Sequence, residues 1–361
     1  MKTKALQLIA VAGLGLAILV SAQATPAGNA GAPAPQKPSS TLPANQPPLQ
    51  LSTPGELPPP QPIRFPPADP KNFTAASPSA ETVNAFLKQL WGYDVNRVWQ
   101  VEAIQKTEAP GTSRVIVFVG DQGSRRGPAE TLFYVTPDGQ HAVAGNQIID
   151  FGADPFAAKR AILQQRANGP ARGPASKALL LVEFMDLQCP QCKAAQPTMD
   201  RLAQDFPGAR IVYQAFPLPQ LHPSAEKAAD YGHCVAQLKG NEAYFKFAQA
   251  VFDNQAALTP TGTDQALKDA AVKAGADAVA VKDCADTTST KDAIAASVQL
   301  GKDLGVNQTP TLFVNGRSLP LSGIPYDTLK QLLTFEETQA SAQPSQGKAA
   351  PLQSKPATSK P

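Results

Sequence analysis

The chain has 361 residues, of which 42% are hydrophobic and 17% charged, with 36 prolines and a formal net charge of +3. This length suits two domains with additional segments. Because the net charge is small and the lysines and arginines form no cluster, we set aside nucleic-acid binding as a function. Sixteen prolines lie between Thr25 and Ala80 and four follow Glu336, so we expect the folded core between these two regions.

The first 24 residues, 1–24, have the features of a secretory signal peptide. Lys2 and Lys4 precede an apolar run from Leu6 to Val20, and Ala22-Gln23-Ala24 has the small-x-small form of a cleavage site. The alternative is an uncleaved anchor, but the run is shorter than the roughly 20 residues that a membrane span needs. We therefore expect a periplasmic or secreted protein, in a compartment where disulfides persist.

Two low-complexity segments flank the expected folded region. Residues 25–76 are rich in Pro, Ala, Gln and Ser, which predicts a disordered linker with polyproline II character. Residues 336–361 are predicted to form a disordered tail.

Residues 77–152 are predicted to form a small α+β domain. Ser77-Pro78 is typical of a helix N-cap followed by a first-turn proline, and apolar residues at helical spacing come after it. Strand-like segments follow at 98–104, 115–119, 131–135 and 143–151. Residues 153–176, with a helix over 154–167 and then a Gly/Pro-rich stretch, are predicted to be a linker helix and hinge.

Residues 177–335 show the order expected of an α/β domain. Leu179 to Val182 form a continuous apolar run, as in a strand buried on both faces. The remaining elements are predicted as a helix over 189–205, a strand over 210–215, a helical insert over about 220–305, a strand over 311–314, a hairpin turn at Asn315-Gly316 and a helix over 326–334. This order predicts a parallel central sheet with a helical cap.

The chemistry centres on Cys189-Pro190-Gln191-Cys192, which follows the buried strand and opens a helix. This context favours a redox role for a C-x-x-C pair. The N–H groups and dipole of a helix N-terminus stabilise a thiolate at Cys189, which becomes a nucleophile at neutral pH. Cys192 lies one turn along the helix, where it can resolve a mixed disulfide.

Two other interpretations of this pair are open. A structural disulfide between residues three apart is rarely the main covalent link of a domain. A zinc site needs four ligands, and the other cysteines and histidines form no second pair with ligand spacing. We therefore expect no metal and no cofactor.

The segment Glu183 to Cys192 resembles the active-site segment of DsbA-like thiol-disulfide oxidoreductases of the thioredoxin superfamily. Besides the C-P-x-C motif, the resemblance includes Glu183, Pro197 in the following helix, and Thr309-Pro310 before a strand. It implies a thioredoxin fold with an inserted helical subdomain, preceded here by the small α+β domain.

The resemblance also implies roles for individual residues. Glu183 matches the buried acid of the family, which implies a proton shuttle to or from Cys192; the alternative is a solvated acid at a strand end. Thr309-Pro310 matches the cis-proline loop that pairs with the substrate backbone, and a trans turn proline is the alternative. Pro190 and Gln191 are expected to contact substrate.

Gln191 lies where the family tunes its reduction potential. Many members have His there, which favours the thiolate, so the neutral Gln191 predicts a less oxidising protein.

Cys234 and Cys284 lie in the helical insert. An even number of remaining cysteines in an exported protein suggests a structural disulfide, as in some DsbA-like proteins, with two free thiols as the alternative. His233 is predicted to lie on a helix surface, and His222 in a loop near the helical cap, where substrate contact is open.

Residues 131–163 faintly resemble the region before the catalytic domain in disulfide isomerases of the DsbC/DsbG type. The resemblance includes Phe133 to Gly139 and Gly145 to Phe151. It implies a homodimer through the N-terminal domain; a monomeric accessory domain is the alternative.

These observations predict an exported thiol-disulfide oxidoreductase that forms, reduces or isomerises disulfides. Its expected partners are cysteine-containing exported proteins and a membrane or soluble redox partner. A non-catalytic peptide-binding or chaperone module on the same fold is the alternative.

Overall fold

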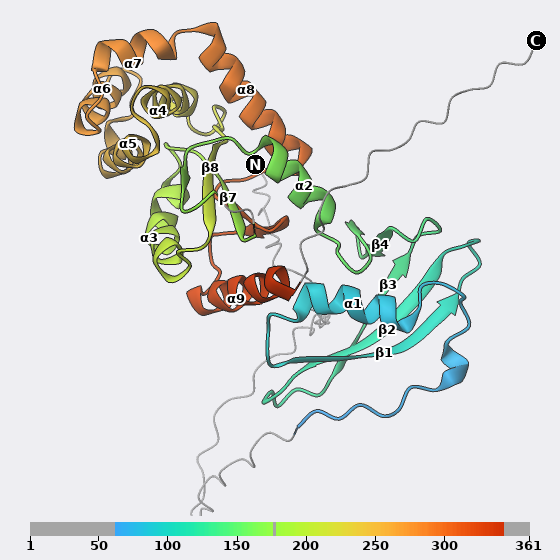
Figure 1. Cartoon of the computed structure of the whole chain (residues 1–361). Helices are drawn as coiled ribbons and strands as arrows, with labels where there is room; N and C mark the ends of the chain where they lie inside the picture. Colours follow the sequence, from blue (N-terminus) through green and yellow to red (C-terminus); the bar gives the residue numbers. More distant parts are fainter. Residues whose placement is uncertain (1–61, 176–177, 343–361) are drawn as a thin grey trace, which may run out of the picture.

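The computed structural model describes residues 62–175 and 178–342, which form two regions of regular structure (Figure 1). The predicted signal peptide, most of the proline-rich linker and the end of the C-terminal tail lie outside the described residues. Each described region contains its own five-stranded sheet.

The N-terminal region is an antiparallel sheet with one helix against it. The strands follow in chain order: β1 (Arg97–Lys106), β2 (Ser113–Asp121), β3 (Ala129–Val135), β4 (His141–Ala144) and β5 (Gln147–Asp150). Helix α1 (Ala80–Trp91) lies across one face of this sheet (Figure 1). Its buried residues at helical spacing, such as Val83 and Phe86, pack against alternate residues of β2 and β3, such as Val115 and Phe133.

The start of α1 differs from the prediction. Ser79 is the N-cap, and its hydroxyl accepts the N–H of Thr82 at 3.1 Å. Ser77 lies before the helix, where its carbonyl accepts the Ser113 hydroxyl at 2.5 Å, and the Ser77-Pro78 bond is cis. The predicted cap therefore belongs to the contact between the incoming chain and β2.

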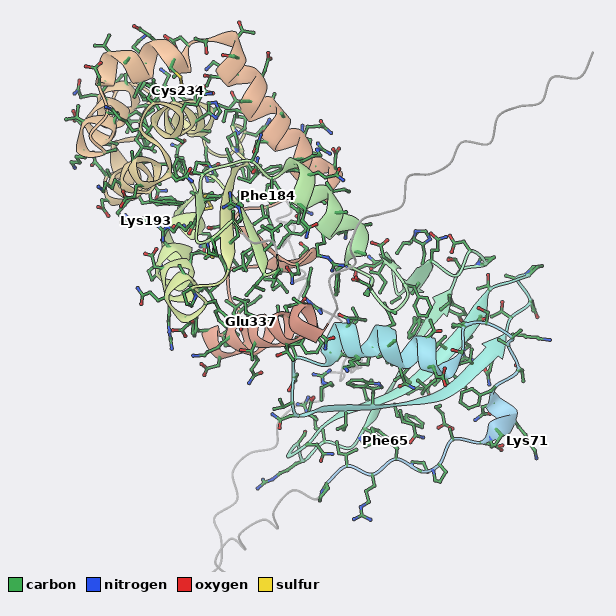
Figure 2. All side chains as sticks on the ribbon, viewed as in Figure 1. Phe65, Lys71, Phe184, Lys193, Cys234 and Glu337 are labelled. Carbon is green, nitrogen blue, oxygen red and sulfur yellow. A yellow bond between two sulfur atoms is a disulfide. The ribbon has the colours of Figure 1, made fainter. Side chains whose placement is uncertain are left out.

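The segment 62–75, which we call the strap, corrects the predicted boundary of the proline-rich linker. It lies along the sheet on the side away from α1, where Figure 2 marks Phe65, and it includes the short helix η1 (Pro70–Asn72). The Gln100 side chain donates to the Pro66 carbonyl at 2.6 Å, and the N–H of Thr74 donates to the Ile104 carbonyl at 2.9 Å. A proline-rich segment without periodicity packs here because the sheet supplies its hydrogen-bond partners.

Residues 143–151 form parts of two strands where one was predicted. β4 and β5 are a hairpin in which His141 pairs with Asp150, and Gly145 in the turn has a φ of 59°. Glycine adopts this left-handed conformation without a steric penalty.

The second sheet has the order β10-β9-β7-β8-β6. Its strands are β6 (Ala171–Arg172), β7 (Leu180–Met185), β8 (Arg210–Ala215), β9 (Thr311–Val314) and β10 (Arg317–Pro320). Only β7 and β8 are parallel, so the predicted parallel sheet is instead mixed.

Strand β6 comes from the segment predicted as a hinge. It pairs antiparallel with β8, and a Cβ at Gly173 would lie 2.0 Å from the Ala209 carbonyl oxygen. The glycines of this segment thus permit close backbone approach to the sheet edge, a role that differs from hinge flexibility.

Helices cover both faces of this sheet. α3 (Pro190–Asp205) and α9 (Tyr326–Ala342) share one hydrophobic cluster with the strands, and α2 (Ala157–Arg166) and α8 (Thr288–Asp303) share the other. The predicted linker helix is therefore part of this domain, since Leu163 of α2 is buried in the second cluster and Arg166 pairs with Asp303 at 2.7 Å. Figure 2 marks Phe184 of β7 within this packing.

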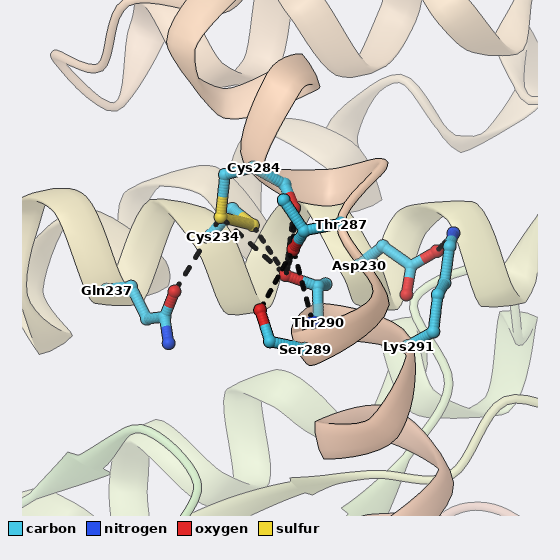
Figure 3. The surroundings of a disulfide bond; sticks show 8 residues. All are labelled: Asp230, Cys234, Gln237, Cys284, Thr287, Ser289, Thr290 and Lys291. Atoms are coloured by element: carbon cyan, nitrogen blue, oxygen red, sulfur yellow. Dashed lines mark hydrogen bonds and ion pairs between the residues drawn. A yellow bond between two sulfur atoms is a disulfide. The ribbon is translucent and has the colours of Figure 1, made fainter.

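The insert between β8 and β9 forms a helical subdomain above the sheet (Figure 1). It contains α4 (Ala225–Lys239), α5 (Asn241–Asp253), η2 (Gln255–Ala257), α6 (Thr263–Lys273), α7 (Ala278–Ala285) and α8. A disulfide joins Cys234 of α4 to Cys284 of α7 (Figure 3). The Thr290 hydroxyl lies 3.4 Å from the Cys234 sulfur and donates to the Cys284 carbonyl at 2.9 Å.

Helix α9 continues beyond the predicted end of the domain, through Glu336 to Ala342. Glu336 is buried and lies 3.6 Å from the Arg317 guanidinium of β10. The predicted tail therefore begins later than residue 336. This ion pair lies where α9 meets α1.

Candidate active site

Cys189 is the N-cap of α3, directly after the loop that follows β7. Pro190 occupies the first turn of the helix, where its missing N–H costs no hydrogen bond. The Cys189 sulfur lies 3.6 Å from the Thr309 carbonyl oxygen. The local sequence is enough to place Cys189 at the helix N-terminus, whereas its contact with Thr309 depends on the tertiary fold.

The environment of Cys189 favours the thiolate. A hydrogen bond from the Cys192 side chain, contact with Thr309 and the N–H groups of Gln191 and Cys192 lower the pKa of Cys189 to about 5. Burial opposes this shift but does not outweigh it. A thiolate at Cys189 could act as a nucleophile at neutral pH.

Cys192 has the opposite character. It is fully buried, and burial raises its pKa well above the ordinary value, with further contributions from the Cys189 thiolate and Glu183. The Asp186 N–H donates to its sulfur at 3.4 Å and opposes this effect. Both cysteines are free in this structure, which therefore shows the dithiol form.

Glu183 lies in the middle of β7 and is fully buried. Within the described residues, neither carboxyl oxygen has a hydrogen-bond partner. Burial raises the Glu183 pKa to about 8, although the Arg172 charge acts against the shift. Such a group holds its proton near neutral pH and can exchange it with Cys192.

Arg172 belongs to the site but was not among the residues predicted from sequence. It lies in β6, pairs with Asp200 of α3 and stacks on Phe245, with its guanidinium carbon 4.1 Å from the ring centre. A single arginine in a Gly/Pro-rich segment offered no signal, because its position depends on the pairing of β6 with β8.

The loop before β9 lies against the cysteines. The Thr309-Pro310 bond is cis, and Pro310 is buried. Gln191 is exposed at the start of α3, as is Lys193, which Figure 2 marks on the outer surface of that helix. The structure thus brings together Glu183, Pro190, Gln191, Thr309 and Pro310 with the two cysteines.

Two glutamines connect the insert to residues 186–189, the loop between β7 and α3 that we call the redox loop. The side-chain oxygen of Gln188 accepts the N–H of Ser224 at 2.6 Å, and its side-chain nitrogen donates to the backbone carbonyl of Leu258 at 3.0 Å. The Gln255 amide donates to the carbonyls of Leu187 at 3.0 Å and Cys189 at 3.1 Å. The insert therefore holds the loop that presents Cys189.

Residues 167–334 match the family model described as thioredoxin. The mixed sheet, the C-P-x-C motif at the start of α3 and the cis-proline loop agree with this match. This segment, a little less than half of the chain, is therefore similar to the thioredoxin family. The predicted fold class is thereby confirmed, with the helical insert between β8 and β9 of this thioredoxin domain.

Two curated relatives match the chain over part of their length. They are Na⁺/H⁺ antiporters NhaA, NhaA 3 of Salinispora tropica at 29% identity over 146 residues and NhaA 1 of Salinispora arenicola at 32% over 148 residues. Each match covers 40% of this chain and 21% of the relative. The chain thus spans about a fifth of these relatives. Among its described residues, no helix has the length and apolar character to cross a membrane.

Three of the solved structures with similarity to the chain are described here. ScsC of Proteus mirabilis is 21% identical, covering 51% of this chain and 79% of that chain with a TM-score of 0.42. BdbD of Bacillus subtilis is 19% identical, covering 47% and 93%, with a TM-score of 0.42. A thioredoxin-like oxidoreductase of Silicibacter pomeroyi is 24% identical, covering 48% and 95%, also with a TM-score of 0.42.

Three further candidate residues, Cys234, Cys284 and His233, lie in helices α4 and α7 of the insert. The disulfide between Cys234 and Cys284 connects two helices of the insert. His233 is half-buried, and burial lowers its pKa. No group of three or more His, Cys, Asp or Glu side chains with metal-binding geometry occurs in residues 62–175 or 178–342.

Proposed function

We propose that the protein is an exported thiol-disulfide oxidoreductase that uses Cys189 as its nucleophile and Cys192 as its resolving cysteine. The observation that carries this proposal is the contrast between the two thiols. The pKa of Cys189 is lowered to about 5, whereas that of its buried neighbour Cys192 is raised. One sulfur is thus ready to attack or leave as an anion while the other retains its proton.

The exchange reaction follows from this contrast. In the oxidising direction, a substrate thiolate attacks Cys189 of the Cys189–Cys192 disulfide, and the electron pair of the broken S–S bond goes to the Cys192 sulfur. Glu183 gives this sulfur a proton. A second substrate thiolate then attacks the substrate sulfur of the mixed disulfide and releases the Cys189 thiolate. The substrate loses two electrons, and the cysteine pair gains them.

The reducing and isomerising directions begin from the dithiol form. The Cys189 thiolate attacks a substrate disulfide and forms a mixed disulfide, which Cys192 or another substrate thiol resolves. Thr309 and Pro310, beside the Cys189 sulfur, are proposed to pair with the substrate backbone, and the exposed Gln191 to contact its side chains. The reduction potential of the pair decides the favoured direction, and the neutral Gln191 favours a less oxidising value.

Two observations support export. The first is the signal-like sequence of residues 1–24. The second is the disulfide in the insert, because such a bond persists in oxidising compartments. We propose cysteine-containing exported proteins as substrates in the periplasm or cell exterior, and a membrane or soluble redox partner that restores the active form.

The proposal is tested with insulin reduction and with refolding of a scrambled disulfide substrate. The wild type is expected to accelerate at least one of these reactions, and Cys189→Ser to lower that rate at least about 100-fold, because the variant lacks the nucleophile. Lys193→Ser, an exposed change four residues along the same segment, is the matched control and is expected to retain activity.

Equal rates for the wild type and Cys189→Ser in both assays would contradict catalysis. A peptide-binding or chaperone role on the same fold would then remain, and suppression of substrate aggregation by both proteins would measure it.

A further inference from the structure

Asp186 contacts both redox cysteines through its backbone. It is the first residue after β7, its N–H donates to the Cys192 sulfur at 3.4 Å, and its carbonyl accepts the Cys189 N–H at 3.1 Å. The orientation of this one residue therefore affects the hydrogen bonds of both sulfur-bearing residues.

The Asp186 side chain is fully buried and makes three hydrogen bonds. One carboxyl oxygen accepts the N–H of Gln188 at 2.7 Å. The other accepts the N–H of Leu218 at 3.0 Å and lies 2.8 Å from Nδ1 of His222. Leu218 and His222 both belong to the loop between β8 and α4, so this carboxylate connects the redox loop to the entrance of the insert.

His222 is the only one of these three donors that is a side chain. Its imidazole is largely buried, with 18% of its surface exposed, while the Asp186 side chain has none. A buried carboxylate without all its partners is costly, so loss of the imidazole donor favours a shift of Asp186. Any shift of Asp186 also displaces its N–H from the Cys192 sulfur.

We propose that His222 is a positioning residue for thiol-disulfide exchange, which acts through Asp186 to hold the peptide N–H that binds the Cys192 sulfur. This inference rests on the proposed function and adds a residue to its machinery. The hydrogen bond from the Asp186 N–H stabilises Cys192 more as a thiol or thiolate than as part of a disulfide, because the reduced sulfur is the better acceptor. His222 therefore favours the reduced form of the pair.

The test is the equilibrium of the Cys189/Cys192 pair with glutathione in the full-length mature protein. His222→Phe, which lacks the donor, is expected to shift this equilibrium about three- to tenfold toward the disulfide, as expected for the loss of one hydrogen bond. His222→Gln retains an N–H donor and is expected to restore at least half of the shift on a logarithmic scale. A general loss of stability affects both redox forms and does not by itself move this equilibrium.

His141 provides a matched control. Its Nδ1 lies 2.8 Å from an Asp138 carboxyl oxygen, the same distance as in the His222–Asp186 pair, but this pair is exposed on the N-terminal sheet. His141→Phe is expected to leave the glutathione equilibrium unchanged.

A wild-type equilibrium constant for His222→Phe would overturn the proposal, as would an equal shift in the Phe and Gln variants. If the Phe variant does not fold, His222→Ala is measured against His222→Gln with the same two criteria. These outcomes are distinguishable from failure of the proposed function, because the glutathione equilibrium is measured on the cysteine pair itself and does not depend on turnover of a protein substrate.

Discussion

Glu183 illustrates how a single side chain can carry an electrostatic cost for the fold. Both of its carboxyl oxygens are buried without a hydrogen-bond partner among the described residues, and its pKa is raised from 4.5 to about 8. The folded protein therefore binds this proton more tightly than the unfolded chain does. Protonated Glu183 therefore makes its full contribution to the free energy of unfolding below pH 4.5. This contribution is lost as the pH rises through about 8.

Glu183→Gln removes this dependence. We expect the oxidised variant, in which the redox cysteines do not titrate, to be more stable than the oxidised wild type at pH 8 by on the order of 2–4 kcal/mol. The difference is expected to shrink toward pH 5. Urea unfolding at both pH values measures it, and Glu108→Gln, a change of an exposed carboxyl, is the control. A difference that is independent of pH would exclude a raised pKa at Glu183.

The same substitution has a kinetic consequence. Because Gln cannot exchange a proton with Cys192, the resolution step is expected to be slower in Glu183→Gln while the attack of Cys189 is retained. Stability and rate thus change in opposite directions at one residue, as is common where a buried ionisable group serves catalysis.

A disulfide joins helices α4 and α7 of the insert. Cys234 and Cys284 are separated by 50 residues, for which the chain-entropy model gives about 4 kcal/mol of stabilisation. The double variant Cys234→Ala/Cys284→Ala is expected to lose about this amount in urea unfolding. Thiol counting on the unreduced wild type provides an independent check, with at most two reactive thiols expected.

The order of the elements was predictable where local patterns are strong. The apolar run of β7, the C-P-x-C motif at the start of α3 and the glycine and proline breaks in the insert all depend on neighbouring residues. The pairing of β6 and the packing of the strap depend instead on distant partners such as Ala209 and Gln100. The local sequence pattern therefore could not predict either contact.

The same distinction applies to the candidate site. Cys189, Cys192 and Glu183 share one short segment, and Thr309-Pro310 was found by resemblance. Asp186 was passed over although it lies within the quoted segment, because its role depends on His222, which is 36 residues away. Hydrogen bonds between a buried acid and a loop residue have no sequence signature of their own.

At the scale of the whole molecule, Arg317 connects the second sheet to helix α1 of the N-terminal region. It is 7% exposed and donates to the carbonyls of Gln89 and Leu90, the latter at 3.3 Å, at the end of α1. It also pairs with Glu336 and lies over the Phe156 ring at 4.3 Å. A cation at the C-terminal end of a helix is favourable because it complements the helix dipole. Arg317 begins β10, at the opposite end of the β9–β10 hairpin from Pro310.

Arg317→Met keeps the aliphatic length but removes the charge and its donors. We expect a loss of about 3 kcal/mol in stability, because Glu336 is left buried without its partner. Faster proteolysis near residues 89–92 is also expected, with an unchanged glutathione equilibrium because the cysteines lie at the other end of the sheet. Lys330→Met, which breaks an exposed ion pair with Asp205, is expected to cost less than about 1 kcal/mol. Equal losses in the two variants would argue against the junction role of Arg317.

The dimer implied by the resemblance of the N-terminal region stays a prediction, which light scattering on the mature protein measures.

The strap has a practical consequence for anyone who shortens this protein. Within the described residues, its contacts begin at Ile63, whose N–H donates to the Gln122 side chain at 3.1 Å and whose side chain lies over Gly120. A fragment that begins at Ser77, the boundary suggested by composition, would uncover the outer surface of β1 and β2 and would be prone to aggregate. Expression of the folded portion should therefore start before Pro62.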